Sequence, residues 1–156
     1  MPIKNAIEKL ETQGKRFGLP KVVKINKKLS KRWGTGTCVI PDPKEVDEFM
    51  KKVPKGKLTT INDIRAKLAK KHKSTIACPI TTGIFSSISA HAAEEMKVQG
   101  KKQITPYWRT LKTGGEINPK YPGGVNYQKK MLEKEGHKVI KKGSKFLIQD
   151  YNKKLV

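Results

Sequence analysis

Residues 58–96 read LTTINDIRAKLAKKHKSTIACPITTGIFSSISAHAAEEM, and this stretch predicts two helices joined by a short connector. The first helix follows Thr60, which can cap it together with Asp63 three positions later. Its apolar face would consist of Ile61, Ile64 and Leu68. Two helices in this order are typical of a helix-turn-helix unit.

The second helix of the pair follows Pro79, and we expect Thr81 or Thr82 to cap it. Helical spacing predicts an apolar stripe of Ile84, Ile88, Ala92 and Met96. The remaining surface is kept small by Ser86, Ser87, Ser89 and Ala90. Small side chains allow close approach of either a neighbouring helix or a nucleic-acid backbone, and the spacing leaves both open.

Further elements flank the helix pair. Asp42 and Pro43 open a short amphipathic helix that ends near Pro54. The segment WRTLKTGGEIN, residues 108–118, predicts a strand, a glycine turn and a return strand, which would form a wing. Residues 124–136 predict another helix, and residues 138–151 predict a β-hairpin. The predicted fold class is therefore α+β, a winged helix-turn-helix domain with a small β wing and a C-terminal β-hairpin.

The chain is strongly basic. Its 156 residues contain 35 Lys and Arg against 13 Asp and Glu, a net charge of +22. This net charge exceeds what a small domain needs for solubility, so we expect a polyanionic partner. The alternative interpretation is a solvated lysine-rich surface. Nucleic acid is favoured over membrane because the sequence shows no long apolar run and no basic amphipathic helix with a bulky apolar face.

Both ends of the chain carry an excess of basic residues. Residues 1–40 contain ten basic and two acidic side chains, and residues 128–156 contain nine and three. Neither the helical nor the strand period is sustained over residues 1–40, so we expect a basic N-terminal arm that is only partly ordered. Residues 41–156 are expected to form the DNA-binding domain.

The two cysteines give no sign of a metal site or a disulfide. Cys38 and Cys78 lie far apart in the sequence, without CxxC or nearby Cys/His spacing. We expect no metal and no cofactor. Reduced cysteines and the lack of a visible signal peptide favour an intracellular location, either cytoplasmic beside the nucleoid or nuclear.

Over residues 53–137 the order of motifs resembles the DNA-binding domain of the alkylguanine-DNA alkyltransferases and their alkyltransferase-like relatives. The pieces are VPKGKLTTINDIRAKLA, the small-residue helix, TPYWRTLKTGGEIN, PGG and QKKMLEKEGH. Members of this methyltransferase family carry a Pro-Cys-His-Arg-Val motif, whose cysteine takes the alkyl group from a flipped guanine. Here the motif is occupied by Pro106, Tyr107, Trp108, Arg109 and Thr110.

The resemblance implies a protein that is not an enzyme. Alkyl acceptance needs a thiolate with a lowered pKa beside a base, and a phenol with a pKa of about 10 beside an indole supplies neither. The family's Cys-His-Glu relay would fall on Tyr107, Trp108 and Glu135, and we expect the remaining glutamate to be structural. Alkyltransferase-like proteins also replace the cysteine, so the resemblance implies binding of alkylated DNA and recruitment of repair proteins.

Two positions depart from the family pattern. The family's phosphate-rotating tyrosine aligns with Ile61, and its intercalating arginine aligns near Ile80. Ile80 would then act as an apolar wedge between base steps or, as the more common case, belong to the core. An insertion at residues 94–103 also lengthens the loop before the Pro106 motif and adds three lysines.

We expect Tyr107 and Trp108 to face a base pocket, with a core position as the other interpretation for each. The predicted DNA-binding residues are Thr60, Thr81, Thr82, Gly83, Ser86, Ser87, Tyr107, Arg109 and Lys112. The leading hypothesis is a monomeric, non-catalytic protein that binds double-stranded DNA and recognises alkylated guanine. Two alternatives stay open: a structural or regulatory winged-helix nucleic-acid binder without lesion recognition, and an enzyme that uses Cys38 or Cys78.

Overall fold

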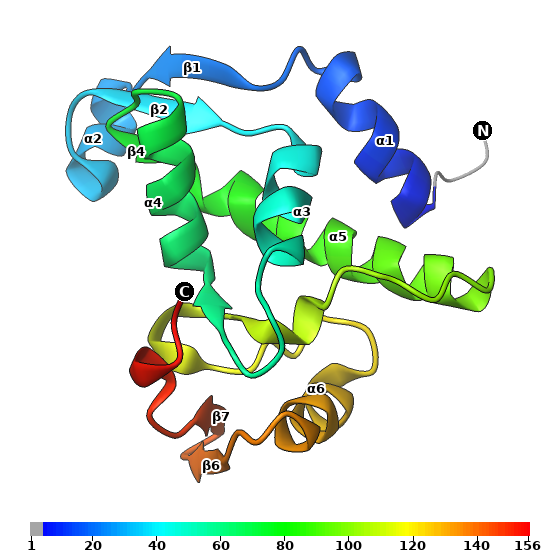
Figure 1. Ribbon diagram of the computed structural model, residues 1–156. Helices are drawn as coiled ribbons and strands as arrows, with labels where there is room; N and C mark the ends of the chain where they lie inside the picture. Colours follow the sequence, from blue (N-terminus) through cyan, green and yellow to red (C-terminus); the bar gives the residue numbers. More distant parts are fainter. Residues whose placement is uncertain (1–4) are drawn as a thin grey trace.

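The computed structural model describes residues 5–156, and its longest helix, α5 (Pro79–Val98), runs through the centre of the molecule (Figure 1). Helices α3 (Pro43–Lys51) and α4 (Ile61–Lys71) pack against α5. Figure 1 shows α1 (Ala6–Arg16) on one side of α5 and α6 (Gly124–Lys134) on the other. The predicted mixed α+β class is confirmed.

Two of the predicted helix starts are confirmed by their hydrogen bonds. The Asp42 carboxylate accepts from the Lys44 N–H at 2.9 Å and completes a capping box at the start of α3. The Thr60 hydroxyl accepts from the Asp63 N–H at 3.2 Å at the start of α4. Both signals are local, so the sequence alone predicts them.

The predicted start of α5 is wrong. The helix begins at Pro79, with Cys78 as the N-cap, because proline is well suited to the first helical position. The buried face of α5 also differs from the predicted stripe, since Ile84 is 52% exposed. The buried positions are Thr82, Phe85, Ser86, Ser89, Ala90, Ala92 and Ala93. The mostly small residues of this face let α1 and α3 pack closely on α5.

The expectation of a partly ordered arm is wrong for residues 5–40, and residues 1–4 lie outside the described part. Helix α1 packs on α5 and α3, and it is followed by β1 (Lys21–Lys24), α2 (Lys27–Trp33) and β2 (Thr37–Ile40). Strand β2 lies between β1, which is antiparallel to it, and β4 (Ile76–Ala77), which is parallel. The sheet therefore joins residues on both sides of residue 40, and a functional division there stays a prediction.

The C-terminal half contains the predicted hairpin but not a regular wing. Strands β6 (Val139–Lys142) and β7 (Lys145–Ile148) pair antiparallel around Gly143–Ser144. In the expected wing, a short 3₁₀ turn covers Thr113–Gly115, and Lys112 meets Glu116 through a single isolated bridge. Both glycines of this turn have a φ of 81°. The return segment pairs with β7 through Glu116 and Leu147, so it does not continue a hairpin of its own.

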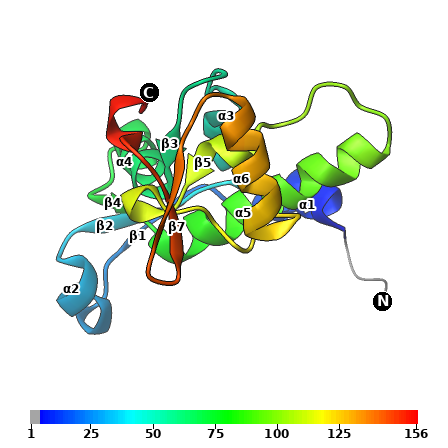
Figure 2. The same cartoon turned by 90° about the horizontal axis from the view of Figure 1, so that it is seen from below.

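The two halves share one hydrophobic core. It combines Val39 of β2, Met50 of α3, Leu68 of α4, Phe85 of α5 and Leu132 of α6. Strand β3 (Thr59–Thr60) pairs parallel with β5 (Thr110–Leu111), which ties the chain before α4 to the segment after the Pro106 motif. Viewed from below, α2 projects from the body of the molecule (Figure 2). Within residues 5–156, no helix has the length and apolar character needed to cross a membrane.

Candidate nucleic-acid interface

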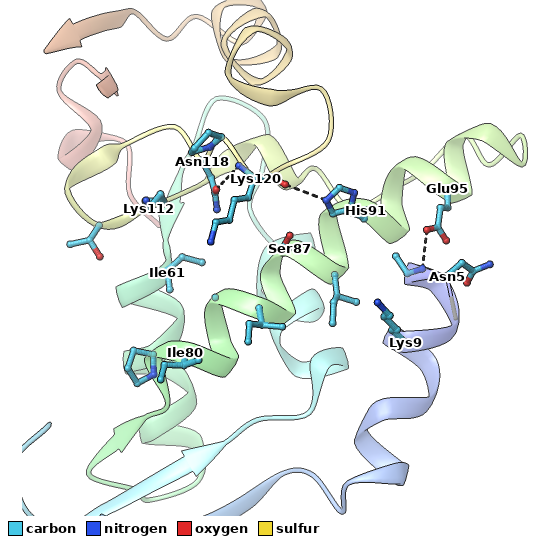
Figure 3. Close-up of a pocket in the computed structure, with 17 residues that line it drawn as sticks. Asn5, Lys9, Ile61, Ile80, Ser87, His91, Glu95, Lys112, Asn118 and Lys120 are labelled. Atoms are coloured by element: carbon cyan, nitrogen blue, oxygen red, sulfur yellow. Dashed lines mark hydrogen bonds between the residues drawn. The ribbon is translucent and has the colours of Figure 1, made fainter. Parts of the chain in front are cut away.

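A groove of about 930 Å³ lies along the exposed side of α5 (Figure 3). Its floor is the N-terminal part of α5, from Pro79 to His91, and one wall is the segment from Lys112 to Lys120. The start of α1 closes the far end, where the Glu95 carboxylate accepts from the N–H groups of Ala6 at 2.9 Å and Ile7 at 3.1 Å. The groove therefore depends on the folding of the N-terminal segment.

The side chains that the floor of the groove exposes to solvent are partly apolar. Ile80 is 60% exposed and Ile84 is 52% exposed, and Ile61 of α4 lies beside them in the lining. The interpretation of Ile80 as a core residue is therefore wrong. The buried face of α5 is already occupied by small residues, so the isoleucines lie on its outer side.

The rim of the groove is basic. Lys9 of α1, Lys112 and Lys120 lie around the opening (Figure 3). The wall near Lys120 is held in place because the His91 ring nitrogen lies 3.2 Å from the Lys120 carbonyl oxygen, and Asn118 accepts from the Lys120 N–H at 3.0 Å. Only Lys112 of the three forms an ion pair among the described residues, a distant one of 3.8 Å with Glu116.

The structure brings three of the predicted DNA-binding residues together in the groove: Gly83, Ser87 and Lys112. Thr60, Thr82 and Ser86 are buried instead. The Thr82 hydroxyl donates to the Cys78 carbonyl at 2.6 Å, and the Ser86 hydroxyl donates to the Gly83 carbonyl at 2.7 Å. Both hydroxyls therefore donate to backbone carbonyls at or near the start of α5 and not to an external partner. Thr81 is half-buried, and its hydroxyl has no partner among the described residues.

Tyr107 lies in the core, with 0% of its surface exposed. Its ring packs edge-on against Trp108 and Tyr121, with centroids 5.4 Å and 5.7 Å away. Its hydroxyl donates to Glu94 at 2.9 Å. Burial, followed by this bond to a carboxylate, raises the pKa of the phenol far above its ordinary range. In this conformation Tyr107 offers neither a ring face to a base nor a nucleophile.

Trp108, Arg109 and Glu135 form a structural cluster. The Glu135 carboxylate accepts from the Trp108 indole at 2.9 Å and from the Arg109 guanidinium at 2.8 Å. Arg109 also donates to the Val53 carbonyl at 2.8 Å. Burial acts to raise the pKa of Glu135, but the bonds from Arg109 and Trp108 outweigh it and lower that pKa. All three guanidinium nitrogens of Arg109 thus donate to groups within the protein. The expected structural role of Glu135 agrees with its contacts.

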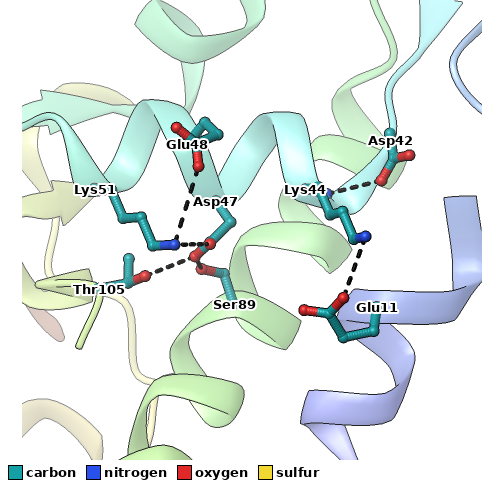
Figure 4. Close-up of polar contacts among 8 residues, drawn as sticks. All are labelled: Glu11, Asp42, Lys44, Asp47, Glu48, Lys51, Ser89 and Thr105. Atoms are coloured by element: carbon teal, nitrogen blue, oxygen red, sulfur yellow. Dashed lines mark hydrogen bonds and ion pairs between the residues drawn. The ribbon is translucent and has the colours of Figure 1, made fainter. Parts of the chain in front are cut away.

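A second polar cluster joins α3 to α5 (Figure 4). The buried Asp47 carboxylate accepts from Ser89 of α5 and, at 2.7 Å, from Thr105 just before the Pro106 motif. Lys51 lies 3.3 Å from the same carboxylate. The sequence does not reveal this role of Ser89, because a small polar residue on a helix gives no signal of its distant partner.

The two cysteines are neighbours in space. Parallel pairing of β2 with β4 sets Cys38 opposite Ile76, two residues before Cys78, and both thiols are free and buried. Burial, followed by the nearby Cys78, raises the pKa of Cys38 to about 11. Such a thiol is a poor nucleophile, which speaks against the enzyme alternative at Cys38. No group of three or more His, Cys, Asp or Glu among residues 5–156 is placed to hold a metal ion.

Several groove residues were not predicted from the sequence. Asn118 and Lys120 follow the glycine turn and enter the groove through the irregular path of that segment. Asn5 and Lys9 reach it only because α1 packs on α5. Nothing local in residues 5–9 indicates that contact.

No family model and no curated protein matches the chain. Two solved structures are similar in fold. One is S. pombe Atl1 in complex with damaged DNA containing O6-carboxymethylguanine, with 18% identity and a TM-score of 0.50. The other is S. pombe ATL in complex with DNA, with 17% identity and a TM-score of 0.52. Each alignment covers 73% of this chain and 93% of the other, and at such identity the likeness shows the fold alone.

Proposed function

We propose that this chain is a non-catalytic DNA-binding protein that holds duplex DNA against the groove of α5. The main support for this proposal is the groove, in which the exposed side chains of Ile80 and Ile84 lie inside a rim of lysines. Lysines on the rim would pair with phosphates on either side of a DNA groove, and the isoleucines would contact base edges or enter between base steps. The net charge of +22 and the fold shared with two DNA-bound structures support the same partner.

The absence of catalysis rests on the chemistry at Tyr107. A buried phenol with a raised pKa, bonded to Glu94, is not activated as an alkyl acceptor. Trp108 beside it has no basic nitrogen. After incubation with DNA that contains an alkylated guanine, we expect the mass of the protein to stay unchanged and the lesion to remain.

We further propose that the protein recognises alkylated guanine and that repair proteins are its later partners. It would act as a monomer in the compartment that holds the DNA, cytoplasmic or nuclear. The support for lesion recognition is the fold shared with a protein bound to DNA containing O6-carboxymethylguanine. The second candidate is a structural or regulatory binder that ignores lesions. It is favoured by the burial of Tyr107, because a closed aromatic cluster cannot stack on an extruded base without opening.

A titration decides between these two candidates. Matched duplexes with and without one O6-alkylguanine are titrated with the protein at fixed salt. A lower Kd on the alkylated duplex supports lesion recognition, whereas equal Kd values support the structural binder. Failure to bind either duplex overturns the proposed function itself.

The groove is tested by a carboxylate placed on its floor. Gly83→Glu suits this because nothing lies within 4 Å of a Cβ added at Gly83, whereas Ser86 is buried and a glutamate there would disturb the core. Val98→Glu is the matched control, with the same charge change at a site of the same helix that is 87% exposed. We expect Gly83→Glu to raise Kd about tenfold more than the control, or about 1.4 kcal/mol. Equal losses in the two variants would place the DNA elsewhere.

A further inference from the structure

A second basic surface lies outside the groove, on the segment from β1 through α2 to β2, which we call the basic projection (residues 21–40). It carries six cations and no acidic residue: Lys21, Lys24, Lys27, Lys28, Lys31 and Arg32. All six side chains are exposed, and α2 has no buried residue. Figure 2 shows α2 extending away from the rest of the molecule.

The charges of the basic projection are not balanced by ion pairs within the described part of the chain. Elsewhere in the chain Lys44, Lys51 and Lys71 form ion pairs with acidic side chains. Among the ion pairs of residues 5–156, none involves a cation of the basic projection. Six neighbouring cations repel one another unless an external anion approaches, so the surface is complementary to a polyanion.

The basic projection is held firmly at its base. The Thr37 N–H donates to the Thr75 hydroxyl at 3.0 Å, and the Thr75 N–H donates to the Thr37 hydroxyl at 3.1 Å. A Cβ on Gly36 would overlap the Thr75 side chain, so the two segments approach closely at this point. These contacts anchor the chain that follows α2 to the residue before β4.

The same base adjoins one end of the groove. Strand β2 pairs with β4, which ends at Ala77, and α5 begins two residues later at Pro79. Pro79 and Ile80 line the groove at this end. DNA that leaves the groove past Ile80 therefore meets the side of the molecule from which the basic projection extends.

We infer that the basic projection binds the phosphate backbone of the same duplex, beyond the stretch held by the groove. The inference rests on the proposed function. Lys27 and Lys31 are one helical turn apart, as are Lys28 and Arg32, so α2 presents paired cations along its side. These cations contact phosphates and read no bases, so they lengthen the footprint without adding sequence preference.

The test uses the full chain and two duplex lengths. The shorter duplex has about 10 base pairs, which spans about 34 Å at 3.4 Å per step and roughly matches the length of α5. The longer duplex has about 24 base pairs and extends past the groove. The variant is Lys27→Gln/Lys28→Gln/Lys31→Gln, and its matched control is Lys130→Gln/Lys134→Gln/Lys138→Gln, three exposed lysines outside any described ion pair.

The expected result depends on duplex length. On the longer duplex the α2 variant binds about tenfold or more weakly than the control, and the slope of log K against log salt becomes shallower by about 2 to 3. On the shorter duplex the variant and the control bind equally. Equal losses at both lengths, or no loss beyond the control at either, overturn the inference while the proposed function stands. Failure of the unaltered protein to bind either duplex overturns the proposed function instead.

Discussion

At residue scale, position 107 shows that a motif does not by itself place a side chain in a site. The motif resemblance puts Tyr107 where the family has its nucleophile, but the structure surrounds the ring with Trp108 and Tyr121 and bonds its hydroxyl to Glu94. The sequence identifies the residue and its chemistry. It cannot reveal the burial, because Glu94 and Tyr121 come from separate elements that only the tertiary fold brings together.

Substitution of Tyr107 is therefore expected to change stability first. Tyr107→Ala should lower the free energy of unfolding by about 3–5 kcal/mol, because it leaves a cavity in a packed aromatic cluster. Tyr107→Phe keeps the ring and loses only the bond to Glu94, so we expect a loss of about 1 kcal/mol or slightly more. Chemical denaturation measures both. If Tyr107→Ala left the stability unchanged but abolished the preference for an alkylated duplex, Tyr107 would instead belong to a base pocket.

His137 predicts that acid weakens the fold. Its side chain is buried, its Nε2 has no partner among the described residues, and burial lowers its pKa below the ordinary 6.5. The unfolded state therefore binds the proton more readily, and the free energy of unfolding falls as the pH drops below about 6.5 and through the folded pKa. Glu135, whose pKa is also lowered, adds a second loss below its ordinary 4.5.

Denaturation curves between pH 8 and pH 4 on His137→Gln test this assignment, with His91→Gln at an exposed position as the control. The pH range is chosen to span the ordinary pKa values of 6.5 for His137 and 4.5 for Glu135. The first loss should be absent from His137→Gln and present in the control. If it persists in His137→Gln, another group is responsible.

At the scale of elements, three signals within a few residues are confirmed, whereas the local signals for the cap of α5 and for the wing are wrong. The capping box of α3, the cap of α4 and the hairpin of β6 and β7 each depend on neighbouring residues, and the sequence predicts them. The order of residues 5–40 depends on contacts of α1 with α5 and of β2 with β4, which no local period reports. The same holds for the groove: the sequence predicts its floor residues Gly83 and Ser87 but not its residues from α1.

Two helical glycines make the α1 packing testable. In α1 a Cβ on Gly14 would overlap the Asp42 carboxylate that caps α3, whereas a Cβ on Gly83 of α5 meets nothing within 4 Å. Alanine should stabilise an open helical position by about 0.5–1 kcal/mol. We therefore expect Gly83→Ala to raise the melting temperature and Gly14→Ala to lower it. A rise in both variants would mean that α1 does not pack closely against Asp42.

At the scale of the whole molecule, the net charge of +22 acts on stability and on binding with opposite dependence on salt. Like charges on a compact protein repel one another, and the repulsion is screened as the Debye length falls from about 30 Å at 0.01 M salt to about 8 Å at 0.15 M. The free protein should therefore gain stability as salt is added. DNA bound through phosphates should add stability that declines over the same range, because salt weakens the binding.

Melting temperatures measured with and without a duplex across this salt range should therefore converge. The curve of the free protein rises, and the excess that the duplex contributes shrinks as Kd increases with salt. A melting temperature of the free protein that does not respond to salt would show that its cations are locally balanced. That result would contradict the exposed lysines of α2, which form no ion pair among residues 5–156. A DNA-induced excess that stays constant with salt would show that the contacts are not to phosphates, and the isoleucines of the groove would then have to carry the affinity.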